Sequence, residues 1–171
     1  QSSRMESWTL EDTKVKSGSH SIDRGVGVRI NSGEKTGFAY SDAITEDGMM
    51  KAVLTARSIV KAQASHQAVK IKTHDYPSYY TQDDLLNNIN NARIIAMLNQ
   101  MDIMARKVDP RIKKVICSLA TSQEYVLVAA TDGTFAADIR PMAKLSIQVI
   151  ANDSKGRMEV GFSGGGGRMT L

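Results

Sequence analysis

The order of apolar periodicities along the chain constrains the fold more than any other feature of the sequence. Apolar residues alternate with polar ones near the amino terminus, recur at helical spacing in the middle and alternate again towards the carboxyl terminus. A period of two is typical of half-buried strands, and a period near 3.6 of amphipathic helices. The sequence therefore predicts an α+β fold: a mostly antiparallel sheet, built from an N-terminal meander and a C-terminal strand block, with two helices on one face.

The N-terminal block predicts three successive strands joined by tight turns. In the middle strand, Ile22, Val26, Val28 and Ile30 share one face, and polar residues or glycine take the other. Gly25 and Gly27 fall on the opposite face, which implies that another group packs closely against the backbone there. We therefore interpret both as structural glycines.

Two helices are expected over roughly residues 45–64 and 82–108. Thr45 is a suitable N-cap for the first helix. Its predicted apolar face comprises Met49, Val53, Ala56 and Val60. Asp109-Pro110 ends the second helix, because a residue that precedes proline is pushed out of helical geometry. A short edge strand is expected between the helices, at residues 69–72.

A second block of strands extends from about residue 115 to residue 162 and begins with the alternating apolar residues Val115, Cys117 and Leu119. Within it, Asp132-Gly133 is a strong hairpin signal, so Gly133 is a third structural glycine. We predict a domain boundary at the start of this block. Residues 1–110 would form the N-terminal strands with both helices, and residues 111–171 the truncated start of the next domain.

Composition and cysteine count exclude several classes of protein. Apolar residues make up 42% and charged residues 23% of the chain, which are values of a globular protein. No apolar run approaches the roughly 20 residues that span a bilayer. The single cysteine, Cys117, excludes an intrachain disulfide and any multi-cysteine metal site. His20, His66 and His74 are too scattered for a sequence-local metal motif.

The densest basic stretch gives little support to a nucleic-acid site. It comprises Arg106, Lys107, Arg111, Lys113 and Lys114. Asp109-Pro110 interrupts the stretch, which holds no aromatic residue on which a base could stack. We interpret it as a solvated helix end, with nucleic-acid binding as the weaker alternative.

Two glycine-rich stretches invite a phosphate-binding interpretation that their context does not support. Gly25 and Gly27 lie inside a predicted strand, and no helix follows Gly164-Gly165-Gly166-Gly167 before the sequence ends. Phosphate loops need glycines between a strand and a helix N-terminus. Four glycines in a row do permit close backbone approach. They suit a flexible hinge or tight packing, or else a surface that hydrogen-bonds to an extended peptide.

Several motifs taken together resemble the bacterial TldD/TldE (PmbA) metalloprotease family. The first is Asp23-Arg24-Gly25-Val26-Gly27-Val28-Arg29, followed by Ser32-Gly33-Glu34-Lys35-Thr36-Gly37-Phe38-Ala39-Tyr40. Residues 128–133, 137–141 and 163–168 match in the same order. The resemblance covers nearly the whole chain and is weakest from about residue 65 to residue 80.

The resemblance implies the N-terminal, non-catalytic portion of a cytoplasmic zinc metallopeptidase. Family members cleave small or unfolded peptides as a heterodimer with a TldE/PmbA subunit, in microcin maturation and antitoxin degradation, and an older family name is modulator of DNA gyrase. The family's zinc ligands lie in a His-Glu-x-x-x-His helix and a C-terminal cysteine, which are absent here. We therefore expect a fragment with no catalytic residue and no zinc ligand. Candidates to line the peptide path are Gly164, Gly165, Gly166, Gly167 and Arg168.

A second hypothesis comes from another class of protein. The absence of a His-Glu motif also suits a stand-alone peptide- or protein-binding module without hydrolase activity, if the chain is complete.

Overall fold

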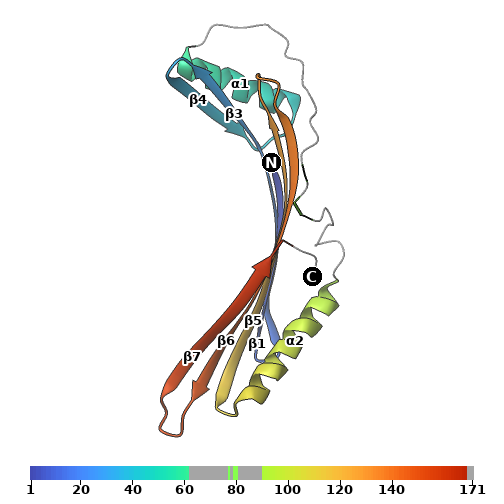
Figure 1. Ribbon diagram of the computed structural model, residues 1–171, viewed down its shortest axis with the longest axis vertical. Helices are drawn as coiled ribbons and strands as arrows, with labels where there is room; N and C mark the ends of the chain where they lie inside the picture. The colour runs from blue at the N-terminus through green and yellow to red at the C-terminus, as the bar shows by residue number, and fades with distance from the viewer. Residues whose placement is uncertain (62–76, 78, 81–89, 169–171) are drawn as a thin grey trace. The chain divides into compact units, whose positions relative to one another are not determined.

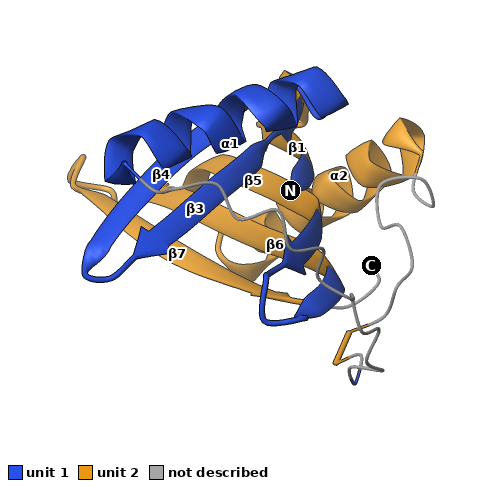
Figure 2. Ribbon diagram, turned by 90° about the horizontal axis from the view of Figure 1, so that it is seen from above, with its two compact units in different colours: residues 1–3, 22–77, 125–138 blue, residues 4–21, 78–124, 139–171 orange. Residues whose placement is uncertain are grey.

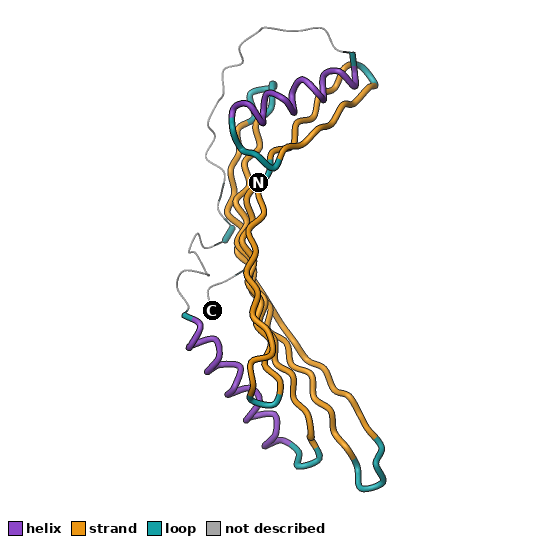
Figure 3. Tube along the Cα trace, turned by 180° about the vertical axis from the view of Figure 1, so that it is seen from behind, coloured by secondary structure: helices purple, strands orange, loops and turns teal. Residues whose placement is uncertain are grey.

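The computed structural model describes residues 1–61, 77, 79–80 and 90–168. Its elements are β1 (Ser2–Glu11), β2 (Lys14–Arg24), β3 (Val26–Ser32), β4 (Lys35–Ser41), α1 (Glu46–Val60), α2 (Asn91–Val108), β5 (Ile112–Ala129), β6 (Phe135–Asn152) and β7 (Met158–Gly167) (Figure 1). One sheet has the strand order β2-β1-β5-β6-β7, and β3 and β4 form a separate two-stranded sheet. Short loops join β1 to β2, β5 to β6 and β6 to β7 (Figure 3). The predicted α+β class is confirmed.

The chain divides into two compact units (Figure 2). Unit 1 contains residues 1–3, 22–77 and 125–138, and unit 2 contains residues 4–21, 78–124 and 139–171. α1 lies in unit 1 with β3 and β4, and α2 lies in unit 2. The strands β5 and β6 contribute residues to both units. Our predicted boundary between residues 110 and 111 stays a prediction.

The N-terminal strands differ in detail from the predicted meander. The strand expected to run through Ile30 is interrupted at Gly25, which separates β2 from β3. The backbone N–H of Gly25 donates to the Gln1 carbonyl over 3.0 Å, and the terminal amine of Gln1 donates back over 2.9 Å. β2 pairs with β1, whereas β3 pairs with β4, from Val26 opposite Ser41 onwards. The four strands therefore belong to two sheets.

α1 packs on β3 and β4 through small residues at every fourth position. The buried ones are Gly48, Ala52, Ala56 and Val60. A Cβ added to Gly37 of β4 would lie 2.1 Å from the Ala56 carbonyl oxygen, so helix and strand backbones touch there. The predicted face was wrong at Met49, which is 38% exposed, and Gly48 takes its place. Ala52 is buried in place of the predicted Val53, which is only half-buried. A Cβ at Gly48 would lie 2.4 Å from the Ala43 carbonyl oxygen, which leaves no room for a side chain.

Both helices begin at side-chain caps. The Thr45 hydroxyl accepts a hydrogen bond from the Gly48 N–H at 3.2 Å, which confirms the predicted cap, and the Asn90 side chain accepts one from Arg93 at 2.8 Å. Asn90 has extended backbone angles, so α2 begins at Asn91 and a continuous helix through residue 90 is wrong. The earlier part of that predicted helix, residues 82–89, and the edge strand at 69–72 lie outside the described residues.

α2 covers the five-stranded sheet in unit 2 through an apolar cluster. Its buried members are Leu10, Ile94, Leu98, Val115, Cys117 and Leu119. Burial raises the pKa of the Cys117 thiol to about 11, and the nearby charge of Asp102 adds to the shift. A neutral thiol without access to solvent cannot act as a nucleophile. Cys117 is therefore a core residue, as its place in an alternating apolar strand predicts.

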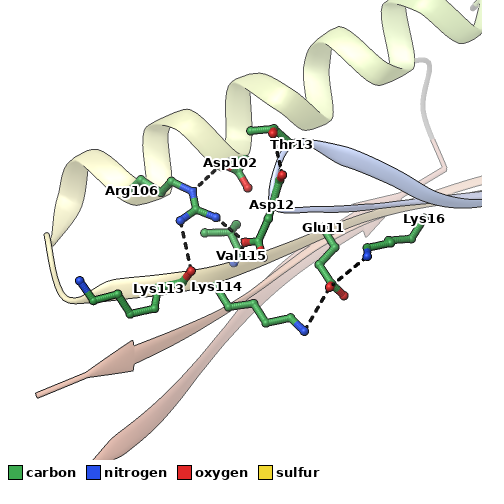
Figure 4. Close-up of polar contacts among 9 residues, drawn as sticks. All are labelled: Glu11, Asp12, Thr13, Lys16, Asp102, Arg106, Lys113, Lys114 and Val115. Carbon is green, nitrogen blue, oxygen red and sulfur yellow. Dashed lines mark hydrogen bonds and ion pairs between the residues drawn. The ribbon is translucent and has the colours of Figure 1, made fainter. Parts of the chain in front are cut away.

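A polar clamp, made of Asp12, Asp102 and Arg106, joins α2 to the turn between β1 and β2 (Figure 4). Arg106 donates from Nε to the buried Asp102 carboxylate over 2.8 Å and from its guanidinium to Asp12. It also donates to the Lys113 carbonyl over 3.3 Å. The Asp12 carboxylate further accepts from the Val115 N–H over 3.0 Å. One guanidinium thus connects the helix, the turn and β5.

The clamp stabilises an unusual turn. Asp12 and Thr13 have φ angles of 48° and 66°, a left-handed conformation that a β-branched residue such as threonine rarely adopts. The hydrogen bond from Val115 and the contact with Arg106 lower the pKa of Asp12. Ionised Asp12 therefore holds the turn in a conformation that its own residues disfavour.

We expect Asp12→Asn to lower the free energy of unfolding at neutral pH by about 1 kcal/mol, because solvent screens part of the lost charge-assisted interaction. The pKa of Asp12 is lower in the folded chain than its ordinary value of 3.8. The charge therefore contributes its full stability above that value, and the contribution is lost as the pH falls through the folded pKa. Melting temperatures of both proteins should converge at acid pH. The control is Asp23→Asn, an exposed carboxyl in β2; a pH-independent difference for Asp12→Asn would contradict the electrostatic role.

Cys117 should resist alkylation in the folded chain. At about pH 8, a pKa of about 11 leaves roughly a thousandth of the thiol ionised, and burial blocks the reagent as well. We expect iodoacetamide to react at least about a hundredfold more slowly with native than with urea-unfolded protein. Mass spectrometry of quenched samples measures both rates. Equal rates would show that this part of the core opens readily.

Candidate functional site

The candidate site is the glycine-rich part of β7, at one edge of the five-stranded sheet. Among the described strands, β7 pairs with β6 alone, in antiparallel register. Gly164 lies opposite Ser146, and Gly165 lies opposite Leu145. An edge strand directs half of its backbone N–H and C=O groups away from its single neighbour. This edge can therefore accept an additional extended chain.

The two faces of β7 differ in character. Three residues of β6 pack against the cluster beneath α2, namely Leu145, Ile147 and Val149. Their direct partners on β7 share that face and are Gly165, Ser163 and Gly161. The other face of β7 carries side chains that are 62–70% exposed, those of Met158, Val160 and Phe162. On the helix-covered side of the sheet, β7 therefore presents almost bare backbone from Gly161 to Gly165.

The glycines of β7 differ in what a side chain would meet. A Cβ at Gly164 would lie 3.0 Å from the Leu145 carbonyl oxygen, and one at Gly166 would lie 2.4 Å from that of Ala143. The backbone of β6 therefore requires glycine at position 166 and leaves little room for a side chain at position 164. A Cβ at Gly165 would meet nothing within 4 Å, and Gly165 does not have a positive φ. Within the described part of the chain, neither contact nor backbone strain requires glycine at position 165.

Arg168 follows directly on β7. Its guanidinium carbon lies 4.9 Å from the centre of the Tyr80 ring, which is within the range of a cation–π contact. The contact restrains the side chain without neutralising its charge. A cation is therefore held at the end of the glycine strand, where it could meet a carboxylate or carbonyl oxygen. The sequence motif identifies Arg168, whereas no local signal connects it with Tyr80.

The three structural glycines each have a physical reason. A Cβ at Gly25 would lie 3.1 Å from the Ser41 carbonyl oxygen, and one at Gly27 would lie 3.1 Å from the Phe38 ring. Gly133 has a φ of 96° in the turn between β5 and β6. They position strands and a turn in unit 1 and take no part in the β7 site.

The described residues do not offer a metal site. No group of three or more His, Cys, Asp or Glu side chains comes together among them. His20 is exposed in β2, Cys117 is buried beneath α2, and His66 and His74 lie outside the described residues. This part of the chain therefore does not fit a zinc ion by itself. Neither described helix has the length and apolarity that a membrane span requires.

The basic stretch is largely compensated by carboxylates of the same chain. Arg111 binds Asp109 through Nε and a terminal nitrogen, the latter at 2.7 Å, and these hydrogen bonds lower the pKa of Asp109 to about 2. Lys114 pairs with Glu11 at 3.2 Å. Arg106 belongs to the clamp described above. Because binding to phosphates depends on a focused positive patch, these pairs argue against the nucleic-acid alternative.

Sequence reasoning missed the buried polar residues. Asp102 and Gln123 are fully buried, and Asp102 continues the line of buried residues of α2 after Ile94 and Leu98. The spacing of Asp102 and Arg106, one helical turn apart, was the available signal for the clamp. The third member, Asp12, is far away in the sequence and could not be assigned without the fold.

Two family models match this chain over different ranges of residues. The model of the PmbA/TldA metallopeptidase domain 1 matches residues 1–60, and that of the central domain of the same metallopeptidases matches residues 84–171. The chain is 40% identical over 173 residues to a metalloprotease TldD homolog of Haemophilus influenzae, and 37% identical over 168 residues to one of Buchnera aphidicola. The first alignment includes all of this chain. The chain covers only 36% of the Haemophilus relative and 35% of the Buchnera relative.

Solved structures share the fold. A candidate modulator of DNA gyrase from Bacteroides thetaiotaomicron superposes with a TM-score of 0.76 at 13% identity, over 98% of this chain and 39% of the other. TldE from Thermococcus kodakarensis gives a TM-score of 0.68 at 14% identity, over 98% and 38%. At such identities the likeness concerns the fold alone. From the matches of residues 1–60 and 84–171 to two of its domain models, the chain belongs to the PmbA/TldD metallopeptidase family.

Proposed function

We propose that this chain is the non-catalytic N-terminal portion of a TldD-like zinc metallopeptidase that cleaves small or unfolded peptides. Two findings together support this proposal. The chain matches the models of two successive domains of a metallopeptidase family. No metal-binding cluster forms among its described residues. The metal and the reacting groups would then belong to the remainder of a full-length protein. The metalloprotease names of the relatives support the metal chemistry.

In this proposal the edge of β7 lines the path of the peptide. An extended peptide that adds to an edge strand is held by backbone hydrogen bonds, which do not depend on its sequence. Gly165 supports the proposal, because a side chain at this position would meet no atom of the described residues within 4 Å. Arg168, held over Tyr80, would bind a carboxylate or carbonyl oxygen of the peptide.

The proposal includes a TldE/PmbA-like partner and a place in the bacterial cytoplasm. TldE from Thermococcus kodakarensis has the same fold over 98% of this chain, which suits the pairing of two similar subunits. Peptide maturation and antitoxin degradation are the reactions in which we expect such an enzyme to act.

A stand-alone peptide-binding module is the second candidate. It is favoured by the same edge strand, if no catalytic portion accompanies the chain in the cell. The two candidates differ in turnover: the peptidase cleaves an unfolded peptide in the presence of zinc, whereas the module binds it intact.

Gly165 offers the sharpest test of the peptide path. In the full-length protein, Gly165→Val should lower kcat/KM for an unfolded peptide at least tenfold while the melting temperature stays unchanged, because the side chain would extend into the open space beside Gly165, where the proposed peptide would lie. Glu159→Val, on the same face of β7, should leave turnover unchanged. Gly166→Ala should instead lower stability by about 1–3 kcal/mol through overpacking. Unchanged turnover in Gly165→Val would remove β7 from the path.

Arg168→Ala tests the charged end of the strand. We expect about a tenfold loss of kcat/KM, because one charge-assisted hydrogen bond contributes roughly 1.5 kcal/mol or more. Arg168→Lys should recover part of the loss, since it keeps the charge but not the fork of donors. Thermal melting of both variants controls for stability. If Arg168→Ala turns over peptide at the wild-type rate, the residue has no role in binding.

A further inference from the structure

The two edge strands of the five-stranded sheet differ in how well they are protected against an added strand. Charged side chains, and lysines above all, discourage strand pairing at an edge. Among the described strands, β2 forms the edge opposite β7, and its sequence contains two lysines, an arginine and an aspartate. β7 carries a single charged residue, Glu159, between Met158 and Gly167. The edge of β7 is therefore the one that suits an incoming extended chain.

The side chains of β7 that point away from the helix-covered side are apolar and exposed. Val160 is 62% exposed and Phe162 is 70% exposed. Their direct partners on β6 are Ile150 and Gln148, which lie on their inner side. The exposed surface of Val160 and Phe162 therefore includes the flank beside the free edge.

A peptide that adds to this edge must follow the alternation of β7. Successive side chains of an extended chain point to opposite faces, and residues directly opposite each other on neighbouring strands share a face. Every second residue of the peptide would therefore lie beside Val160 or Phe162. The residues between them would lie beside Gly161, Ser163 or Gly165. Parallel and antiparallel addition both preserve this alternation.

We propose that the edge of β7 selects peptides by alternation and binds best those with an apolar residue at every second position. The inference rests on the proposed function and adds a substrate class to it: extended peptides that are apolar on one face. Apolar residues beside Val160 and Phe162 remove apolar surface from water on both strands. On the other face, glycine offers no side chain with which a peptide residue could pair, so those positions accept residues of any kind.

Two peptides of identical composition test the alternation. Both contain equal numbers of valine and threonine between terminal lysines. In one peptide valine and threonine alternate singly, and in the other they alternate in pairs. Both residues are β-branched and favour strands, so the peptides differ only in arrangement. In the second peptide, valine never recurs two residues later, so Val160 and Phe162 cannot both lie beside a valine.

The full-length protein should consume the singly alternating peptide roughly threefold faster from an equimolar mixture with zinc, because apolar cross-strand pairs each contribute a modest factor. Mass spectrometry of the mixture gives the ratio of the two kcat/KM values, which does not depend on how much of the enzyme is folded. The double variant Val160→Ser with Phe162→Ser should bring the ratio to about one. The matched control is Val15→Ser, at a 44% exposed residue of the opposite edge strand, which should keep the wild-type ratio.

The possible results separate this inference from the proposed function. Equal consumption of both peptides by the wild type would overturn the inference and leave the proposed function standing. If neither peptide is cleaved, the proposed peptide path at β7 fails, and the inference fails with it. A preference that persists in the double variant would place the selection outside β7 and would also overturn the inference.

Discussion

The packing of α2 on one face of the five-stranded sheet is the interaction on which the described structure depends most. Leu10 of β1 and Leu119 of β5 meet Leu98 of α2 in the largest apolar cluster, and each fully buried leucine contributes on the order of 2 kcal/mol. Residues of β6 join the margin of this cluster and thereby fix the strand on which β7 is built. The glycine edge is thus positioned by a core to which it contributes no side chain.

Much of the fold could be predicted because burial imposes local periods. The alternation of Val115, Cys117 and Leu119 and the hairpin at Gly133 are patterns of neighbouring residues, and the structure places them as expected. The break between β2 and β3 at Gly25 could not be predicted, because Gly25 exchanges hydrogen bonds with Gln1, which directly precedes β1. Local sequence does not show which distant strand will satisfy a backbone group.

The sequence indicated the glycine-rich stretch of the candidate site but not the role of each residue in it. Four consecutive glycines stand out in any sequence, yet β6 crowds Gly164 and Gly166 and does not crowd Gly165. That division requires knowledge of which β6 carbonyl lies beside each residue. The placement of Arg168 over Tyr80 likewise joins segments that no spacing rule relates. Polar clamps such as Asp12 with Arg106 escape prediction for the same reason.

The pairing of β1 with β5 has a consequence for how the chain folds. The Asp12 carboxylate receives its hydrogen bond from Val115, 103 residues later. During synthesis β1 and β2 leave the ribosome long before β5 exists, so they can form at most an isolated hairpin, which is marginally stable in water. Closing so long a loop costs entropy before any contact of the core is gained, and such topologies fold slowly. Until β5 arrives, the nascent chain exposes an unpaired strand edge, which makes this interval the one in which aggregation or chaperone binding competes with folding.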